Sequence, residues 1–122
     1  MGLRVLVVED ELIIGLDIAR QLDGAGFEVL GPATSVETAL RFVAEPGCDV
    51  AVLNVHLGGE TSEPVARELR ACSKPFVVVS GDSTDSLSSS FNGAIVLTKP
   101  LPITDILSAV RRCVDMRRCP GA

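Results

Sequence analysis

The chain has 122 residues, which is the common size of one domain and too short for two. Hydrophobic residues make up 47% and charged residues 22%, a balance that is typical of a globular domain with a sizeable core. The formal net charge is −5, which argues against direct binding of nucleic acid, because such binding normally needs a basic face. The basic residues near the C-terminus instead suit the negative end of a final helix. They are Arg111, Arg112, Arg117 and Arg118.

The sequence also argues against a membrane-bound, exported or zinc-binding protein. No apolar run approaches the length of a membrane span. Charges at positions 9 to 11 interrupt the first apolar run, so we expect no secretory signal and a cytoplasmic location. The cysteines lie far apart without a CxxC pair, and we expect reduced, mostly buried thiols rather than zinc ligands or a disulfide. They are Cys48, Cys72, Cys113 and Cys119.

The first half of the chain alternates short aliphatic runs with helical patterns. A strand is predicted at residues 4–8 and a helix at 11–22. The apolar face of this helix comprises Leu12, Leu16, Ala19 and Leu22. A second strand at 27–30 precedes a helix that Thr34 and Glu37 begin with a capping box. The apolar residues of this second helix are Val36, Ala39, Leu40, Val43 and Ala44.

The alternation continues in the second half. A strand at residues 50–53 precedes a helix that begins near Ser62, with Pro64 in its first turn, where a missing N–H costs nothing. The residues that this helix should bury are Val65, Leu69 and Cys72. A fourth strand follows at 76–79, and a fifth lies at 94–97. Most of the predicted strands are apolar throughout, which is typical of parallel strands buried on both faces.

The segment at residues 81–93 breaks the pattern, because it is rich in serine and its only apolar residues are Leu87 and Phe91. Serine competes for backbone hydrogen bonds, so we expect a short or irregular fourth helix there. The last helix begins after Thr104. It should bury Ile106, Leu107, Val110 and Val114. The whole order predicts an α/β fold in one domain, residues 1–122, with a doubly wound parallel sheet in the strand order 2-1-3-4-5.

Polar residues stand where the predicted strands end. Glu9 and Asp10 follow the first strand, Asn54 the third, Ser80 the fourth and Lys99 the fifth. Because parallel strands end at the same edge of a sheet, we expect these side chains to meet there. Two carboxylates and an amide oxygen suit Mg²⁺, and a hydroxyl and an ammonium suit phosphoryl oxygens. This edge is therefore the candidate site.

At these residues the chain resembles the response-regulator receiver family of two-component signalling, over essentially its full length. The matching segments are Val7-Val8-Glu9-Asp10-Glu11, Asp49-Val50-Ala51-Val52-Leu53-Asn54, Val79-Ser80-Gly81 and Leu97-Thr98-Lys99-Pro100. The segment Leu57-Gly58-Gly59-Glu60 is similar to a loop of short, stand-alone receivers. The resemblance implies a flavodoxin-like fold.

The resemblance also implies a role for each site residue. Glu9 and Asp10 would hold Mg²⁺, with the residue at position 54 and the backbone carbonyl of His56. Ser80 and Lys99 would contact a phosphoryl group, and the bond from Lys99 to Pro100 would be cis. The partner would be a sensor histidine kinase or a phosphotransfer protein, and a homodimer is left open.

Three departures from the family pattern bear on function. The family places an aspartate that accepts phosphate where this chain has Asn54. A neutral amide is a poor nucleophile, and it removes one negative charge, so any Mg²⁺ site should be weakened. Val96 stands where the family usually has Tyr or Phe, and the serine-rich segment stands in place of a full fourth helix.

Three hypotheses follow. The first is a signalling and protein-interaction module, not an enzyme, that takes no phosphate at Asn54. The second is an ordinary receiver in which the aspartate at position 54 was replaced by asparagine through engineering. The third is a flavodoxin-like cofactor-binding protein, which ranks last because no phosphate-binding loop follows the first strand.

Overall fold

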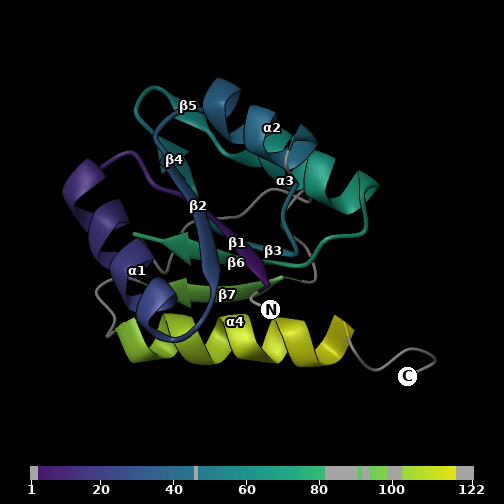
Figure 1. The fold of residues 1–122 in the computed structure, drawn as a ribbon. Helices are drawn as coiled ribbons and strands as arrows, with labels where there is room; N and C mark the ends of the chain where they lie inside the picture. Colours follow the sequence, from purple (N-terminus) through teal and green to yellow (C-terminus); the bar gives the residue numbers. More distant parts are fainter. Residues whose placement is uncertain (1–2, 46, 82–90, 92–93, 99–102, 118–122) are drawn as a thin grey trace.

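The computed structural model describes residues 3–45, 47–81, 91, 94–98 and 103–117 (Figure 1). Within them a five-stranded parallel sheet forms in the order β2-β1-β3-β6-β7. Its strands are β1 (Arg4–Val8), β2 (Glu28–Ala33), β3 (Val50–Asn54), β6 (Phe76–Ser80) and β7 (Ile95–Thr98). With the strands counted in chain order, this is the predicted order 2-1-3-4-5, so the doubly wound α/β fold is confirmed.

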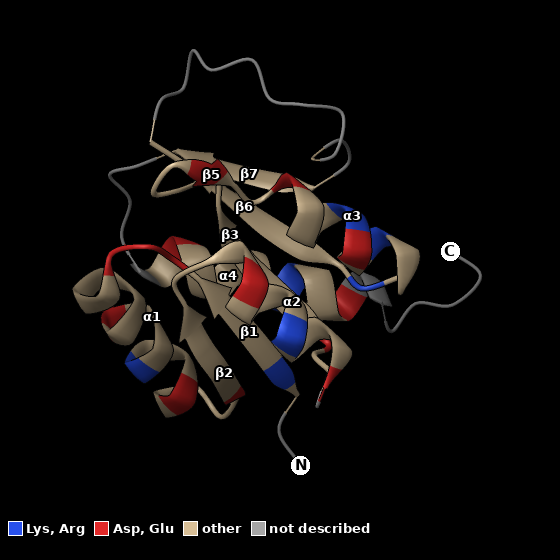
Figure 2. Cartoon of the chain, turned by 90° about the horizontal axis from the view of Figure 1, so that it is seen from above, with Lys and Arg blue, Asp and Glu red and all other residues tan. Residues whose placement is uncertain are grey.

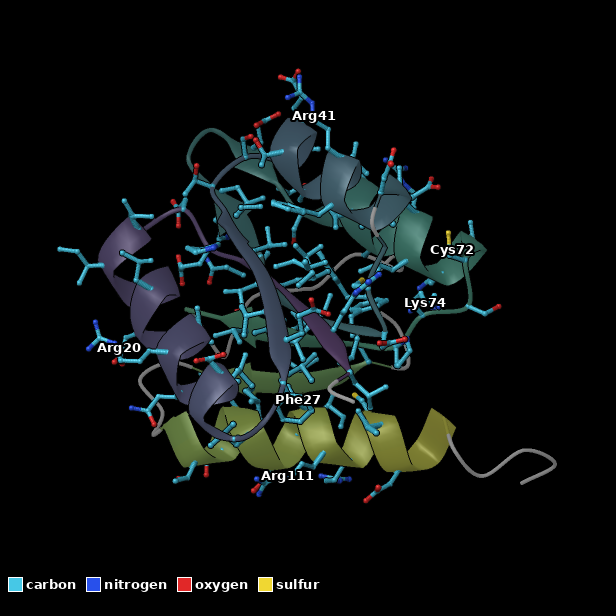
Figure 3. The ribbon with its side chains drawn as sticks, viewed as in Figure 1. Arg20, Phe27, Arg41, Cys72, Lys74 and Arg111 are labelled. Carbon is cyan, nitrogen blue, oxygen red and sulfur yellow. The ribbon has the colours of Figure 1, made fainter. Side chains whose placement is uncertain are left out.

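Helices cover both faces of the sheet (Figure 1). On one face lie α1 (Leu12–Gly24) and α4 (Ile103–Arg117), and on the other lie α2 (Val36–Ala44) and α3 (Glu63–Ala71). A small antiparallel hairpin, β4 (His56–Leu57) and β5 (Glu60–Thr61), connects β3 to α3. Exposed cations such as Arg20 on α1 and Arg111 on α4 point away from the sheet (Figure 3). No helix in the described ranges is long and apolar enough to cross a membrane.

The central strands are buried on both faces, as their unbroken aliphatic runs predict. In β1, Leu6 and Val8 pack toward α2 and α3, whereas Val5 and Val7 pack toward α1 and α4. Each fully buried side chain of this kind contributes about 1.5–3 kcal/mol relative to exposure. The hydrophobic core thus fixes the positions of the ends of β1, β3 and β6 relative to one another.

The predicted face of α1 is wrong in part. Leu12 is 54% exposed and Leu16 is 47% exposed, whereas Gly15, Ile18 and Leu22 are buried. Gly15 is buried because the helix lies directly against Pro32 of β2, with only 2.7 Å between an added Cβ and the Pro32 Cβ. Because of this close approach, α1 turns the face with Gly15, Ile18 and Leu22 toward the sheet, and not the face that its leucines predict.

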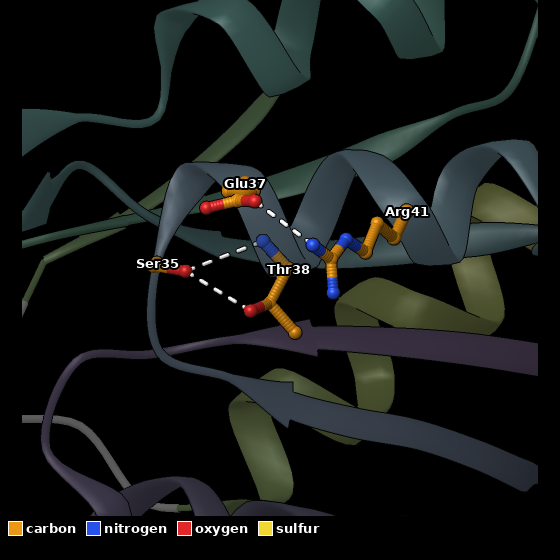
Figure 4. A network of polar contacts seen from close by, with 4 residues as sticks. All are labelled: Ser35, Glu37, Thr38 and Arg41. Carbon is orange, nitrogen blue, oxygen red and sulfur yellow. Dashed lines mark hydrogen bonds and ion pairs between the residues drawn. The ribbon is translucent and has the colours of Figure 1, made fainter.

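The predicted cap of α2 is wrong by one residue. The N-cap is Ser35, whose Oγ accepts a hydrogen bond from the Thr38 amide at 3.2 Å and lies 3.1 Å from the Thr38 hydroxyl (Figure 4). Glu37 pairs instead with Arg41, one turn further on. The side chain of Ser35 therefore satisfies one of the free N–H groups at the helix start.

The other elements lie within two residues of their predicted bounds, except that β2 ends at Ala33, three residues later than predicted. The helix α3 begins after Ser62, with Pro64 in its first turn, and α4 begins two residues earlier than predicted. Cys72, however, is exposed rather than buried, because α3 ends at Ala71 (Figure 3). The predictions for residues 82–90, for Pro100 and for Cys119 lie outside the described residues.

Candidate functional site

The predicted site residues that the structure describes gather at the carboxyl edge of the sheet. Asn54 and Ser80 are the last residues of β3 and β6, and Glu9 and Asp10 come directly after β1. Glu9 and Ser80 are each 2% exposed and Asn54 is 9% exposed, whereas Asp10 and His56 are exposed. Figure 2 shows the acidic residues of this edge in the loop that leads into α1. Lys99 lies outside the described residues.

The side-chain amide of Asn54 donates to two oxygen atoms. Its Nδ2 lies 2.7 Å from the backbone carbonyl oxygen of His56 and 3.4 Å from Oδ1 of Asp10. Both neighbours are acceptors, so only the NH₂ group of the amide can face them, and the hydrogen-bond network determines the orientation. The end of β3 therefore presents a donor to the loop after β1.

The carboxylate of Asp10 joins this loop to the small hairpin. Its Oδ2 accepts a hydrogen bond from the backbone amide of Gly58 at 3.0 Å. Gly58 has a φ of 64°, a left-handed conformation that glycine adopts at little cost, and it begins the turn between β4 and β5. The Gly58-Gly59 pair thus serves turn geometry and also places an N–H against the acidic loop.

Two further contacts shape this edge. The buried carboxylate of Glu9 accepts a hydrogen bond from the backbone amide of Glu11 at 3.2 Å, which turns the chain toward α1. The sequence indicated Ser62 only as the start of a helix, yet it is fully buried where the hairpin meets α3, and its Oγ has no hydrogen-bond partner among the residues that the structure describes. The amide of Gly58 was also missed, because a backbone donor leaves no signal in residue type.

The oxygen atoms at this edge can be compared with the ligands that a divalent cation requires. The oxygen atoms of Glu9, Asp10 and the His56 carbonyl are the ligands that Mg²⁺ prefers. The Asn54 NH₂ group, however, faces two of these oxygens, and a cation cannot share that position with N–H hydrogens. As arranged, the residues do not fit the ion. Within the described ranges, no group of three His, Cys, Asp or Glu side chains is placed to hold a metal.

No known family model matches the chain. It is 28% identical over 119 residues to the transcriptional regulatory protein PdtaR of Mycobacterium tuberculosis, covering 94% of this chain and 58% of PdtaR. The chain therefore spans a little over half the length of this relative.

Solved structures provide closer matches in shape. A CheY-like response regulator receiver domain from Methanospirillum hungatei superposes with a TM-score of 0.85, at 18% identity, covering 97% of this chain and 98% of that one. A response regulator protein from Burkholderia pseudomallei, solved with a phosphorylated aspartic acid, a calcium ion and citrate, has a TM-score of 0.79. It is 20% identical, over 96% of this chain and 72% of that one. The chain therefore has the flavodoxin-like fold of response regulator receiver domains.

Proposed function

We propose that this chain is a receiver domain of a two-component system that signals through protein contacts and accepts no phosphoryl group at position 54. The fold supports the first half of this proposal, and so do the acidic residues at the carboxyl edge of its sheet. In the Burkholderia pseudomallei protein an aspartic acid carries the phosphoryl group. A receiver of this kind is a signalling module rather than an enzyme.

The observation that carries the second half is the amide of Asn54 at the end of β3. Transfer to an aspartate requires an anionic oxygen that attacks phosphorus and forms an acyl phosphate. The Asn54 amide has no such oxygen, and its NH₂ group is held by His56 and Asp10. A phosphoryl donor bound at this edge would face N–H hydrogens at the position where transfer requires a nucleophilic oxygen.

The partners follow from the same proposal. A sensor histidine kinase or a phosphotransfer protein would recognise the receiver surface, and this binding would not depend on a phosphoryl group at position 54. Ser80 is buried at the end of β6, where its hydroxyl would donate to a phosphoryl oxygen, and Lys99 would pair with the same phosphoryl group. Mg²⁺ would bind weakly, because the Asn54 amide must turn over before its oxygen can act as a ligand.

One other candidate has support in the structure. An ordinary receiver with an engineered asparagine would retain the other candidate residues. The position of Glu9, Asp10 and Ser80 at the carboxyl edge of the sheet supports this alternative. Restoring the aspartate would then restore phosphorylation. The flavodoxin-like cofactor-binding alternative has no comparable support, since the similar structures named above are receivers.

The test is the intact mass of the chain and of its Asn54→Asp variant after incubation with Mg²⁺ and a small phosphodonor. We expect no phosphoryl adduct on the chain itself and one adduct on the variant. An adduct that maps to residue 54 of the unaltered chain would refute the proposal. A folded variant that takes up no phosphate would show that the pocket lacks more than the carboxylate.

A further inference from the structure

Two oxygen atoms that are far apart in the sequence converge on one NH₂ group. The Asp10 carboxylate comes from the loop after β1, and the His56 carbonyl comes from the first residue of the hairpin. The Asn54 amide between them has two N–H hydrogens, one for each acceptor. The same Asp10 carboxylate accepts the Gly58 amide at the hairpin turn, so all three segments are joined through it.

Such a cluster of oxygens is unfavourable unless something positive lies between its members. A carboxylate and a carbonyl oxygen that face one another at the end of a sheet repel each other. A divalent cation relieves that repulsion, and so does a hydrogen-bond donor, although a neutral amide brings no net charge. In this chain the donor is part of the polypeptide.

We propose that the Asn54 side chain is a built-in replacement for the divalent cation, which holds the acidic loop and the β4–β5 hairpin in one arrangement without metal. The inference deepens the proposed function, because it gives the non-phosphorylatable pocket one constitutive conformation. A module that signals through protein contacts alone would then present the same hairpin surface whether or not Mg²⁺ is present.

The geometry makes the amide and the metal mutually exclusive. For Mg²⁺ to enter, the amide has to turn over about its Cβ–Cγ bond, which breaks both of its hydrogen bonds. Its oxygen would then face the His56 carbonyl across the present separation of 2.7 Å. Metal binding must therefore compensate for lost hydrogen bonds, whereas with aspartate at position 54 there would be none to lose.

The hydrogen exchange rate of the Gly58 amide tests this arrangement, because that N–H donates directly to Asp10. The variants are Asn54→Asp, which turns the donor into an acceptor, and Asn54→Ala, which removes the donor without adding charge. The amide of Val52, in the buried centre of β3, serves as a reference for changes in global stability.

In the presence of chelator we expect Gly58 to exchange about tenfold faster in both variants than in the unaltered chain, measured relative to Val52. Excess Mg²⁺ should slow Gly58 exchange in Asn54→Asp and leave the unaltered chain unchanged. If either variant fails to fold, the inference is tested on the unaltered chain alone, by comparing the Gly58 exchange rate with and without Mg²⁺.

Three outcomes would overturn the inference. In the first, Mg²⁺ slows Gly58 exchange in the unaltered chain. In the second, Asn54→Ala exchanges as slowly as the unaltered chain in chelator. In the third, Mg²⁺ does not change Gly58 exchange in Asn54→Asp. This edge would then bind no cation even with aspartate present, so the Asn54 amide could not be a replacement for one. A phosphoryl adduct at residue 54 would refute the proposed function separately, so the two failures can be distinguished.

Discussion

The side-chain nitrogen of Asn54 lies 2.7 Å from the backbone carbonyl oxygen of His56, only two residues further along the chain. An aspartate in the same position would place an oxygen there instead, and two oxygen acceptors at that separation repel each other. The local backbone conformation therefore suits a donor at position 54. This relationship links the residue type at the end of β3 to the stability of the carboxyl edge of the sheet.

The first prediction is that Asn54→Asp lowers stability in the presence of chelator, by on the order of 1 kcal/mol. The variant loses the hydrogen bonds to His56 and Asp10 and places another negative charge beside Asp10 and Glu9. Excess Mg²⁺ should narrow the difference, because ligand binding to the native state stabilises it. Urea melts of both proteins, with chelator and with Mg²⁺, measure the effect.

The matched control for this prediction is Gln21→Glu, which makes the same change from amide to carboxylate at an exposed position of α1. It should change the unfolding midpoint far less and should show no response to Mg²⁺. Equal stability of Asn54→Asp and the unaltered chain in chelator would contradict the charge argument.

The second prediction concerns the start of α2. Ser35→Ala removes the oxygen that accepts the Thr38 amide and should cost about 1 kcal/mol of stability. Thr34→Ala is the control, because Thr34 is exposed and precedes the cap. Thermal melts of the two variants compare them, and an equal loss at both positions would mean that Ser35 is not the residue that caps the helix.

The third prediction concerns thiol reactivity. Burial raises the pKa of the Cys113 thiol, and the neighbouring Arg112 opposes this shift only in part. A raised pKa leaves less thiolate at neutral pH, and thiolate is the form that reacts, so Cys113 should be alkylated slowly in the folded protein. Among these three cysteines, which lie in the described part of the chain, Cys72 is exposed and should react first, whereas the buried Cys48 should be protected.

Peptide mapping after brief alkylation at neutral pH measures the three rates. The same reaction in denaturant is the control, and there the rates should become similar. Faster alkylation of Cys113 than of Cys72 in the folded protein would show that the Cys113 thiol is not buried between α4 and the sheet as the structure indicates.

Much of the fold could be predicted from the aliphatic runs, because the strands of a parallel sheet that is buried on both faces are apolar at almost every position. The phase of α1 could not, since Leu12, Ile13, Ile14 and Leu16 make its first turns apolar all round. Its orientation depends on the contact of Gly15 with Pro32, and a glycine carries no hydrophobic signal.

The gathering of the candidate site residues at one edge was predictable for a different reason. The carboxyl ends of parallel strands share one edge, so residue order alone brings Glu9, Asp10, Asn54 and Ser80 together. The direction in which the Asn54 amide points was not predictable, because it depends on the His56 carbonyl and the Gly58 turn. Such backbone groups look the same in every sequence.

The side-chain NH₂ resonances of Asn54, in a nitrogen-15 NMR spectrum of the full chain, test the central claim most directly. We predict two distinct, slowly exchanging hydrogens in chelator, one bonded to His56 and one directed at Asp10. Their positions should stay unchanged when Mg²⁺ and then a small phosphodonor are added. Resonances that exchange as fast as those of an exposed amide, or that move when Mg²⁺ or the phosphodonor is added, would contradict the claim that His56 and Asp10 hold this amide in place.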